Sequence, residues 1–198
     1  QTDYREIQPV EEREYYALSY AQRRLWVLCQ FEEDSTAYNM PTALMLRGDF
    51  QPNAFQRAVQ KLADRHQSMR TVFVMVDGAP YQRVIRDFKF KLEIRDLANL
   101  DAGEKEEKSR KIYTDVANCV FDLEKGPLFR ITVVRLDEDN YLLIYNIHHI
   151  INDGWSQGNI NNEIISMYNA FAKGEEQELP PLTLQYKDYT QWHADLID

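Results

Sequence analysis

Two adjacent histidines, His148 and His149, form the densest cluster of chemically capable residues, within the stretch 147–156 (IHHIINDGWS). They follow a nearly all-apolar segment, so they are expected at the end of a buried strand, with Asp153 and Gly154 in the turn that follows. Imidazole can take up and release a proton near neutral pH, which suits it to general base catalysis. Because side chains alternate across a strand, one imidazole is expected to face a reaction site while the other braces the structure.

The residue types alone leave three interpretations of this cluster open. In the first, both histidines lie in the core and Asp153 caps the following helix, where the helix dipole favours a negative charge. In the second, the histidines bind a metal ion, which requires a third and usually a fourth ligand. His66 and His193 are the other two histidines, and neither belongs to a motif with ligand spacing. In the third, one histidine is a general base supported by an ion pair between Asp153 and an arginine.

The periodicity of apolar residues predicts the helices and strands that position this cluster. The sequence contains no internal repeat. Helices are predicted over 19–31, 52–66, 101–120, 155–173 and 186–197, and strands over 42–46, 71–76, 81–85, 90–94, 128–136 and 141–147. Ser19 and Gln22 have the spacing of a capping box, and Asp101 is placed to cap the third helix. The segment 77–80 (DGAP) is a hairpin turn in which Ala and Pro lengthen the Asp-Gly pair.

Helices and strands mix along the chain without strict alternation. The expected fold class is therefore an α/β (α+β) two-layer sandwich, in which one mostly antiparallel mixed sheet is covered by helices. Alternation along the last strand predicts that His149 shares a face with Tyr145, and His148 the opposite face with Asn146. In the first helix, Leu25, Leu28 and Cys29 are expected on one face, with Trp26 at its border.

Length and composition are those of a soluble globular chain. The sequence has 198 residues, of which 44% are hydrophobic and 28% charged, which argues against a disordered protein. No apolar run approaches the roughly 20 residues of a membrane-spanning helix, and the mean hydropathy is −0.56. A formal net charge of −9 argues against nucleic-acid binding, because phosphate recognition depends on clustered Lys and Arg.

The N-terminal sequence and the cysteines indicate the cellular compartment in which the chain is expected. The first residues, QTDYREIQPVEERE, contain no apolar stretch of a secretory signal and no initiator Met. We therefore expect a cytoplasmic chain that is a piece of a longer polypeptide. Cys29 and Cys119 lie far apart in the sequence, and both are expected to be buried free thiols of a reduced compartment.

The segment 147–156 resembles the HHxxxDG signature of the condensation domains of nonribosomal peptide synthetases, which share a chloramphenicol acetyltransferase-like fold. Three further segments resemble motifs of this family in the same order: 18–28 (LSYAQRRLWVL) the first, 65–73 (RHQSMRTVF) the second and 186–192 (YKDYTQW) the fourth. The sequence departs from the family pattern where Gln67, Met69 and Asn152 replace the usual Glu, Leu and Ser. These departures leave the histidines, the Asp and the Gly of the signature unchanged.

The resemblance implies one lobe of a two-lobed domain. In this family two similar lobes face each other across a tunnel, and the later motifs, which belong to the second lobe, are absent from this sequence. Residues 1–14 are then expected to be a linker from a preceding carrier region. Residues 15–198 are expected to be the N-terminal lobe.

The resemblance also implies a reaction, the amide bond formation of antibiotic-type peptide biosynthesis. The amine of an acceptor aminoacyl thioester attacks a donor acyl or peptidyl thioester, and each is carried on the phosphopantetheine arm of a carrier protein. No cofactor is expected to bind the chain directly. His149 is then the catalytic imidazole, and His148 supports the site.

Roles for the neighbouring residues follow from the same resemblance. Gly154 is expected to keep the tunnel open and to offer its N–H to the developing oxyanion. A buried carboxylate needs a partner, so Asp153 is expected to pair with Arg65, with Arg70 as the second choice.

The expected partners are carrier proteins, the C-terminal lobe of the same domain and an adjacent adenylation domain, with neither nucleic acid nor membrane. Two alternatives remain open. The isolated lobe could be only a folding or interaction module without turnover. The chain could also be a coenzyme A-dependent acyltransferase that uses the same HHxxxDG motif.

Overall fold

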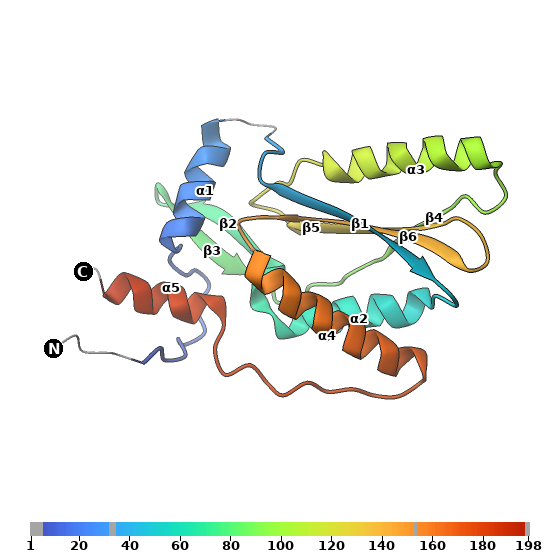
Figure 1. Ribbon diagram of the computed structural model, residues 1–198. Coiled ribbons are helices and arrows are strands. Elements are labelled where there is room, and N and C mark those ends of the chain that lie inside the picture. The colour runs from blue at the N-terminus through green and yellow to red at the C-terminus, as the bar shows by residue number, and fades with distance from the viewer. Residues whose placement is uncertain (1–5, 32–34, 153, 197–198) are drawn as a thin grey trace.

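The central sheet has four strands in the order β1-β6-β5-β4 (Figure 1). The computed structural model describes residues 6–31, 35–152 and 154–196 of the chain. The strands are β1 (Asn39–Arg47), β4 (Glu93–Asp96), β5 (Phe129–Arg135) and β6 (Asn140–His148). Strand β6 pairs antiparallel with β1 and β5, whereas β4 runs parallel to β5. The sheet is therefore mixed and mostly antiparallel, as predicted.

Strands β2 (Thr71–Val76) and β3 (Ala79–Val84) form a separate two-stranded hairpin. Asp77 and Gly78 form its turn with φ angles of 49° and 81°, the left-handed conformation that a two-residue hairpin turn requires. The expectation that residues 79–80 lengthen this turn is wrong, because both already pair with β2 in the ladder.

Helices cover both faces of the central sheet. Among the described residues they are α1 (Tyr20–Phe31), α2 (Pro52–Arg65), α3 (Ala102–Ala117), α4 (Gly154–Ala172) and α5 (Tyr186–Asp195), with the 3₁₀ helix η1 (Gln67–Arg70) after α2. Helix α3 lies on one face, and α2 and α4 lie on the other (Figure 1). The predicted α/β class with a helix-covered sheet is confirmed, but there are three layers rather than the expected two. None of the described helices combines the length and apolar character needed to cross a membrane.

The apolar residues of β6 explain the third layer. Ile144 packs with Val116 and Val134 on the side of α3. Leu143 and Ile147 belong to the larger core on the side of α2 and α4. A strand that is apolar at both odd and even positions must be covered on both faces.

Two helices begin as their sequences predict. Ser19 N–H donates to Gln22 Oε1 at 2.9 Å, and Gln22 N–H donates to Ser19 Oγ at 3.1 Å, which confirms the capping box before α1. Before α3, the Asp101 carboxylate accepts a hydrogen bond from the N–H of Glu104 at 2.9 Å. The N-terminal ends of α1 and α3 are thus fixed by hydrogen bonds between residues three apart, so the local sequence is sufficient to predict them.

Helix α3 ends at Ala117, before the predicted end at residue 120. The side-chain amide of Asn39 donates to the carbonyls of Ala117 and Cys119, both at 2.9 Å. The amide of Asn146 donates to the carbonyls of Val116 at 2.8 Å and Ala117 at 3.1 Å. These amides, which come from β1 and β6, satisfy carbonyls that a helix end leaves without intrahelical partners.

Helix α1 is only partly buried, and Gln22 is its one fully buried residue among those described. Leu25 packs against the larger core, whereas Leu28, expected on the same face, is 38% exposed. Cys29 and Cys119 are free thiols. Both have intermediate exposure rather than the full burial expected of them. Burial nevertheless raises the pKa of the Cys119 thiol.

Candidate functional site

His148, the last residue of β6, is held inside the structure and is 2% exposed. Its Nδ1 accepts a hydrogen bond from the N–H of Ile150 at 3.1 Å, and its Nε2 lies 3.8 Å from Cys29 Sγ. Burial, followed by the charge of His149, lowers the pKa of His148 from 6.5 to about 4. The ring is therefore neutral at physiological pH, and because Nδ1 is an acceptor the proton lies on Nε2. His148 braces the strand end.

His149, one residue later, is exposed. Its N–H donates to the carbonyl of Tyr38 at 2.9 Å, which fixes the backbone at this point. The residue lines a cavity of about 370 Å³. Asn146 bonds to the end of α3, whereas Tyr145 packs against the larger core on the side of α2 and α4. The two faces of β6 thus differ as alternation predicts, and a catalytic role for His149 stays a prediction.

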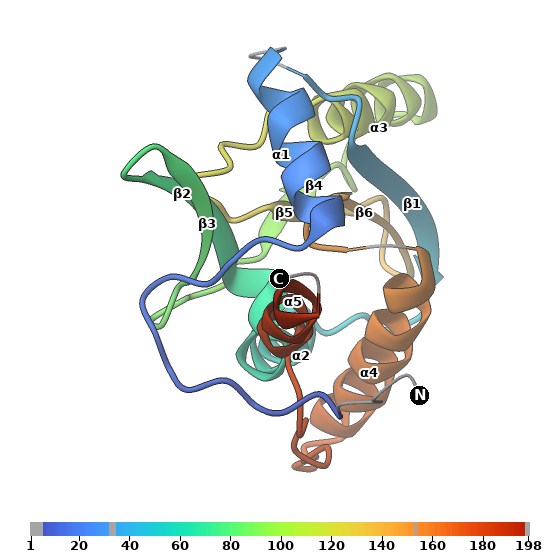
Figure 2. The same cartoon turned by 90° about the vertical axis from the view of Figure 1, so that its left-hand side faces the viewer.

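All four motif segments contribute to the walls of this cavity, which we call the motif cavity. Its lining includes Ala21, Gln22 and Leu25 of segment 18–28, His66, Gln67, Ser68 and Thr71 of segment 65–73, His149, Ile150, Ile151 and Asn152 of segment 147–156, and Tyr186 and Lys187 of segment 186–192. Segments separated by more than a hundred residues thus meet around one exposed imidazole. Figure 2 shows α1 and α5, which carry the first and fourth segments, at the same end of the molecule.

The second motif is fastened to α4 through Glu163. Arg65 Nε lies 3.2 Å from Glu163 Oε2, and His66 Nε2 lies 2.6 Å from the same oxygen. Arg65 also donates to the carbonyl of Pro180. The three charged or ionisable side chains are only 16–20% exposed, so water screens this cluster weakly. Sequence reasoning misses Glu163, because nothing in its helical sequence distinguishes it from a surface glutamate.

Arg70 makes contacts of another kind. Its Nε donates to the carbonyl of Ala63 at 3.0 Å, and its Nη1 donates to the carbonyl of Ile85 at 2.8 Å. It therefore joins the end of α2 to the residue after β3. Asp153 lies outside the described residues, so its pairing with Arg65 or Arg70 stays a prediction. Gly154 is the first residue of α4, and nothing further is described at that position.

Gln67 shows what a family departure does in this cavity. Its N–H donates to Gln185 Oε1 at 3.0 Å. Its own Oε1 is buried, with no hydrogen-bond partner among the described residues. Among the described residues, a carboxylate at this place would find no hydrogen-bond donor for the corresponding oxygen, and an unpartnered buried charge is far more costly than an unpartnered amide oxygen.

The fourth motif binds the chain's own N-terminal segment. Asp188 accepts the N–H of Val10 at 2.9 Å and the N–H of Gln185 at 2.7 Å. Lys187 donates to the carbonyl of Val10 at 3.4 Å and to the hydroxyl of Tyr16 at 3.3 Å. Lys187 and Asp188 are 7% and 3% exposed, and inside the structure each charge is hydrogen-bonded to neutral groups of residues 10, 16 and 185. The described part of the expected linker 1–14 therefore lies against α5.

The ligand requirements of a metal ion are not met in the described part of the chain. Within residues 6–31, 35–152 and 154–196, no three side chains of His, Cys, Asp or Glu are grouped closely enough to hold one. Among the described residues His66 has a carboxylate neighbour in Glu163 and His148 a thiol neighbour in Cys29, and neither pair belongs to a group of three such side chains.

The chain is similar in sequence to one protein family and to several synthases. The profile of the family described as "Condensation domain" matches residues 12–197. The chain is 38% identical over 192 residues to bacitracin synthase 3 of Bacillus licheniformis, covering 97% of the chain and 3% of that protein. It is 40% identical over 190 residues to bacitracin synthase 2 of the same organism, covering 96% of the chain and 7% of that protein. Gramicidin S synthase 2 of Brevibacillus brevis is 36% identical over 191 residues, which cover 96% of the chain and 4% of that protein.

Solved structures share the fold. A starter condensation domain of rhizomide synthetase superposes with a TM-score of 0.84 at 21% identity, over 93% of this chain and 44% of that one. The X-domain from teicoplanin biosynthesis superposes with a TM-score of 0.86 at 25% identity, over 98% of this chain and 41% of that one. The chain thus spans less than half of each of these two solved structures and a small fraction of each curated relative.

Proposed function

The chain belongs to the condensation domain family, and we propose that it is the N-terminal lobe of a domain that forms amide bonds between carrier-bound thioesters. In this reaction the amine of an acceptor aminoacyl thioester attacks the carbonyl carbon of a donor acyl or peptidyl thioester. The observation that carries the proposal is the motif cavity, where segments from four separate regions surround the exposed imidazole of His149.

His149 is the proposed catalytic residue because the other imidazole of the pair is unsuited to the role. His148 is buried, its pKa is about 4, and its single ring proton faces Cys29. His149 opens to the cavity and can accept a proton from the attacking amine. The carbon–nitrogen bond forms and the carbon–sulfur bond breaks. The proton then passes from His149 to the thiolate of the donor arm, so charge and atoms balance.

The turn after β6 is proposed to stabilise the tetrahedral intermediate. Gly154 begins α4, and the N–H groups of a first helical turn have no acceptor within their helix. Such a group can donate to the oxyanion that develops on the thioester oxygen. We also propose that Asp153 pairs with Arg65, so that Arg65 would join that turn to the second motif. Its contact with Glu163 already ties the second motif to α4.

The proposed partners follow from the relatives, which are synthases many times longer than this chain. Carrier proteins would present both substrates on phosphopantetheine arms, and no cofactor would bind the lobe directly. A C-terminal lobe would close the cavity from the other side, and an adenylation domain would load the acceptor carrier. The proposed location is the cytoplasm.

The test uses the complete two-lobed domain that contains this chain. The domain is mixed with a donor carrier and an acceptor carrier, each loaded with an aminoacyl thioester, and the product on the acceptor carrier is measured by mass spectrometry. Formation of the dipeptide on that carrier is expected. A parallel reaction replaces the donor carrier with the same acyl group on coenzyme A. Product only from coenzyme A would favour the acyltransferase alternative, and product from neither donor would favour an interaction module without turnover.

A further inference from the structure

The motif cavity contains a second imidazole, which the proposed function does not use. His66 is the residue that ends α2, and it lines the cavity together with His149. The described lining contains no Asp, Glu or Cys, and its other polar side chains are amides, hydroxyls and the ammonium of Lys187. Imidazole is the side chain that takes up and releases a proton near neutral pH. The two histidines are therefore the residues of this lining that are suited to proton transfer.

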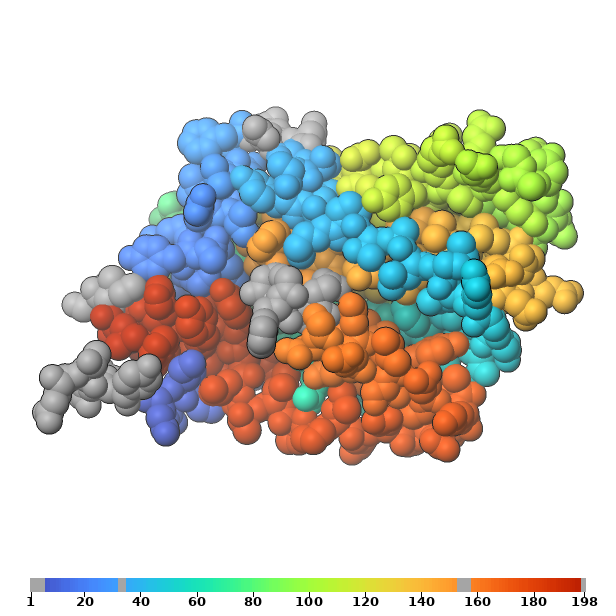
Figure 3. Space-filling model, viewed as in Figure 1, coloured from blue at the N-terminus to red at the C-terminus, as the bar shows by residue number. Residues whose placement is uncertain are grey.

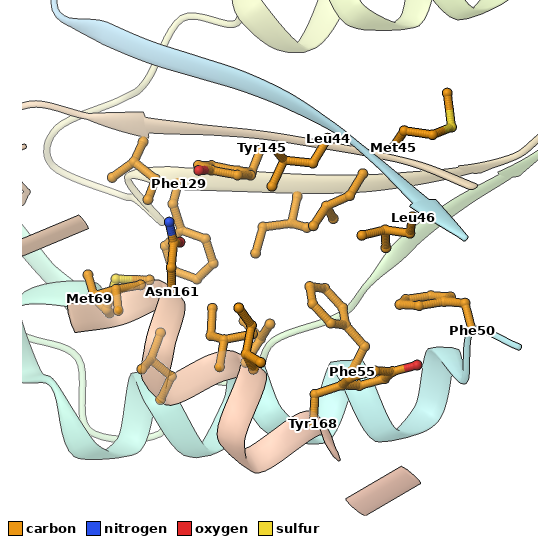
Figure 4. Close-up of a pocket in the computed structure, with 18 of the residues that line it drawn as sticks. Leu44, Met45, Leu46, Phe50, Phe55, Met69, Phe129, Tyr145, Asn161 and Tyr168 are labelled. Carbon is orange, nitrogen blue, oxygen red and sulfur yellow. The ribbon is translucent and has the colours of Figure 1, made fainter. Parts of the chain in front are cut away.

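The segment after α2 separates this cavity from an apolar one. A second cavity, of about 480 Å³, lies between the central sheet and helices α2 and α4, and Met69 of η1 is part of its wall (Figure 4). Its lining is almost entirely aliphatic or aromatic and contains no histidine among the described residues. Residues 66–68 of the same segment line the motif cavity instead. Of the two cavities, the motif cavity is therefore the one suited to proton transfer.

The backbone and the ring of His66 are both held in place. Its N–H donates to the carbonyl of Leu62 at 2.8 Å, and its carbonyl accepts the N–H of Met69 at 3.0 Å. Its Nε2 lies 2.6 Å from Glu163 Oε2, and the two side chains are 19% and 20% exposed. This contact joins α2 to α4, and Figure 3 shows α4 and the segment after it covering part of α2. The ring is thus fixed in one orientation, while part of its surface stays accessible.

The contact with Glu163 determines which nitrogen of the His66 ring carries a proton. A carboxylate only accepts hydrogen bonds, so Nε2 is the donor. In the neutral ring Nδ1 then has a free lone pair. Within the described part of the chain, the hydrogen bond of this ring is the one to Glu163. An imidazole whose one nitrogen is held by a carboxylate and whose other nitrogen can take up a proton is the arrangement of a general base.

The condensation of the proposed function, on which this inference rests, removes two protons from the acceptor nitrogen. An α-amino group has a pKa of about 8, so at pH 7 only about a tenth of it is the neutral amine. The ammonium must lose its first proton before the nitrogen can attack. The second proton leaves after the carbon–nitrogen bond has formed, and His149 passes it to the thiolate. The first proton therefore needs an acceptor of its own.

We propose that His66 is a catalytic residue that takes up this first proton, and that Glu163 is the residue that positions it. An N–H bond of the ammonium breaks and an Nδ1–H bond forms, which leaves a neutral amine for the attack. The carboxylate of Glu163 offsets the charge of the imidazolium. The imidazolium gives its proton to water after the product leaves, so charge and atoms balance over one turnover.

The described charges around the ring come from three helices. Glu163 of α4 contacts the ring, and Arg65 of α2 lies 3.2 Å from the same carboxylate oxygen. Lys187 of α5 lines the cavity, and its ammonium is hydrogen-bonded to the carbonyl of Val10 and the hydroxyl of Tyr16. Among the described residues, Glu163 is thus the carboxylate in ion-pair contact with the ring. Its removal takes away the group that both orients the ring and stabilises its protonated form.

The test compares His66→Gln with the parent in the complete two-lobed domain, with both carriers loaded. Glutamine keeps an N–H donor for Glu163 but cannot take up a proton. Without His66, only the acceptor that arrives as a neutral amine can react, which is about a tenth of it at pH 7 and about nine tenths at pH 9. The variant should therefore form the dipeptide about tenfold more slowly than the parent at pH 7, and at most about twofold more slowly at pH 9.

An acceptor that has no first proton to lose provides a second measurement. An α-aminooxy group is a much weaker base than an α-amine, so it is already neutral at pH 7. His66→Gln should use an aminooxy acceptor at the parent rate while it remains slow with the amine. Because both rates are measured on the same variant, their ratio does not depend on the fraction of folded protein. Glu163→Gln should change this ratio in the same direction, since the ring loses its positioning partner.

His193→Gln is the matched control, because His193 stacks on Tyr189 and lies outside the described lining of the motif cavity. It should keep the parent ratio of the two acceptors at pH 7 and the parent rate at pH 9. The parent ratio in His66→Gln, or an equal loss of rate at pH 7 and pH 9, would overturn the role of His66 and leave the proposed function intact. No product from the parent domain would refute the proposed function, and this role with it.

Discussion

The imidazole of His66 and the carboxylate of Glu163 meet at 2.6 Å between Nε2 and Oε2, across the boundary between the second motif and α4. The same oxygen lies 3.2 Å from Arg65 Nε. His66 lines the motif cavity, whereas Glu163 does not. One carboxylate oxygen thus holds two motif residues, and through them it couples the wall of the motif cavity to the helix that begins at Gly154.

The first prediction concerns Glu163→Gln. The amide keeps the size of the side chain but removes the charge that both partners share. Hydrogen bonds to charged groups are worth more than neutral ones, so we expect a loss of about 1–3 kcal/mol in the free energy of unfolding. Urea denaturation monitored by circular dichroism measures it. Glu176→Gln, which breaks the exposed pair with Arg57, is the control and should change the midpoint little. Equal midpoints for the two variants would contradict the structural role of Glu163.

The second prediction is a pH dependence of stability caused by His148. Its pKa is lowered from 6.5 to about 4 in the folded chain, chiefly by burial. Between these two values the unfolded chain binds a proton that the folded chain does not. The free energy of unfolding should therefore fall as the pH falls from about 6.5 to 4, by up to about 3 kcal/mol from this residue.

Two measurements separate His148 from the other titrating groups. In His148→Gln the decrease in unfolding free energy between pH 6.5 and 4 should be smaller than in the parent chain, whatever the stability of the variant at neutral pH. The imidazole signals in NMR spectra should also show one histidine that keeps its neutral chemical shifts down to about pH 5. A midpoint near 6.5 for that signal would show that His148 is not buried as described.

The difference in burial between the two histidines could be predicted from sequence, because it follows from strand alternation. His148 ends the apolar strand β6 and His149 follows it, and the structure buries the first and exposes the second at the motif cavity. The capping box of Ser19 and Gln22 was predictable for the same reason, since all its atoms lie within one turn of chain.

Features that depend on the distance between layers could not be predicted. The burial of Lys187 and Asp188 requires the segment around Val10 to return against α5, which no local pattern indicates. Glu163 gains its partners only because α2 and α4 pack side by side.

The third prediction separates catalysis from support in the complete domain. His149→Ala should reduce the rate of dipeptide formation by about 10²-fold or more, as expected for loss of a general base. It should leave the melting temperature nearly unchanged, because the side chain is exposed. His148→Ala should instead lower the melting temperature, since it empties buried space beside Cys29. Single-turnover rates and thermal melts measure both effects, and parent-level turnover in His149→Ala would refute its assignment.

The fourth prediction concerns the N-terminal segment that α5 holds. Asp188→Asn removes the charge of the acceptor that binds the N–H groups of Val10 and Gln185, and so weakens both hydrogen bonds. The segment 6–14 should then be cleaved faster in limited proteolysis, while the rest of the chain stays resistant. Asp195→Asn is the control on the same helix. Asp195 is exposed, and among the described residues its hydrogen bond is with Gln191, not with the N-terminal segment. Equal cleavage rates would show that Asp188 does not fasten the segment.

The last prediction concerns the chain on its own. The motif cavity supplies His149 and one wall, and in the proposed function the opposite wall belongs to a second lobe. One wall cannot hold two thioester arms in attack geometry, and such alignment accounts for roughly 7–11 kcal/mol of a bimolecular barrier. The 198-residue chain should therefore fold, since both of its apolar cores are enclosed by its own helices and sheet, yet form no dipeptide from two loaded carriers.

Mass spectrometry of the acceptor carrier after prolonged incubation measures the product, with the complete domain as the positive control. Adding the separately expressed second lobe should restore part of the activity, because it completes the walls around His149. Dipeptide formation by the chain alone at the rate of the complete domain would show that a single lobe aligns both substrates.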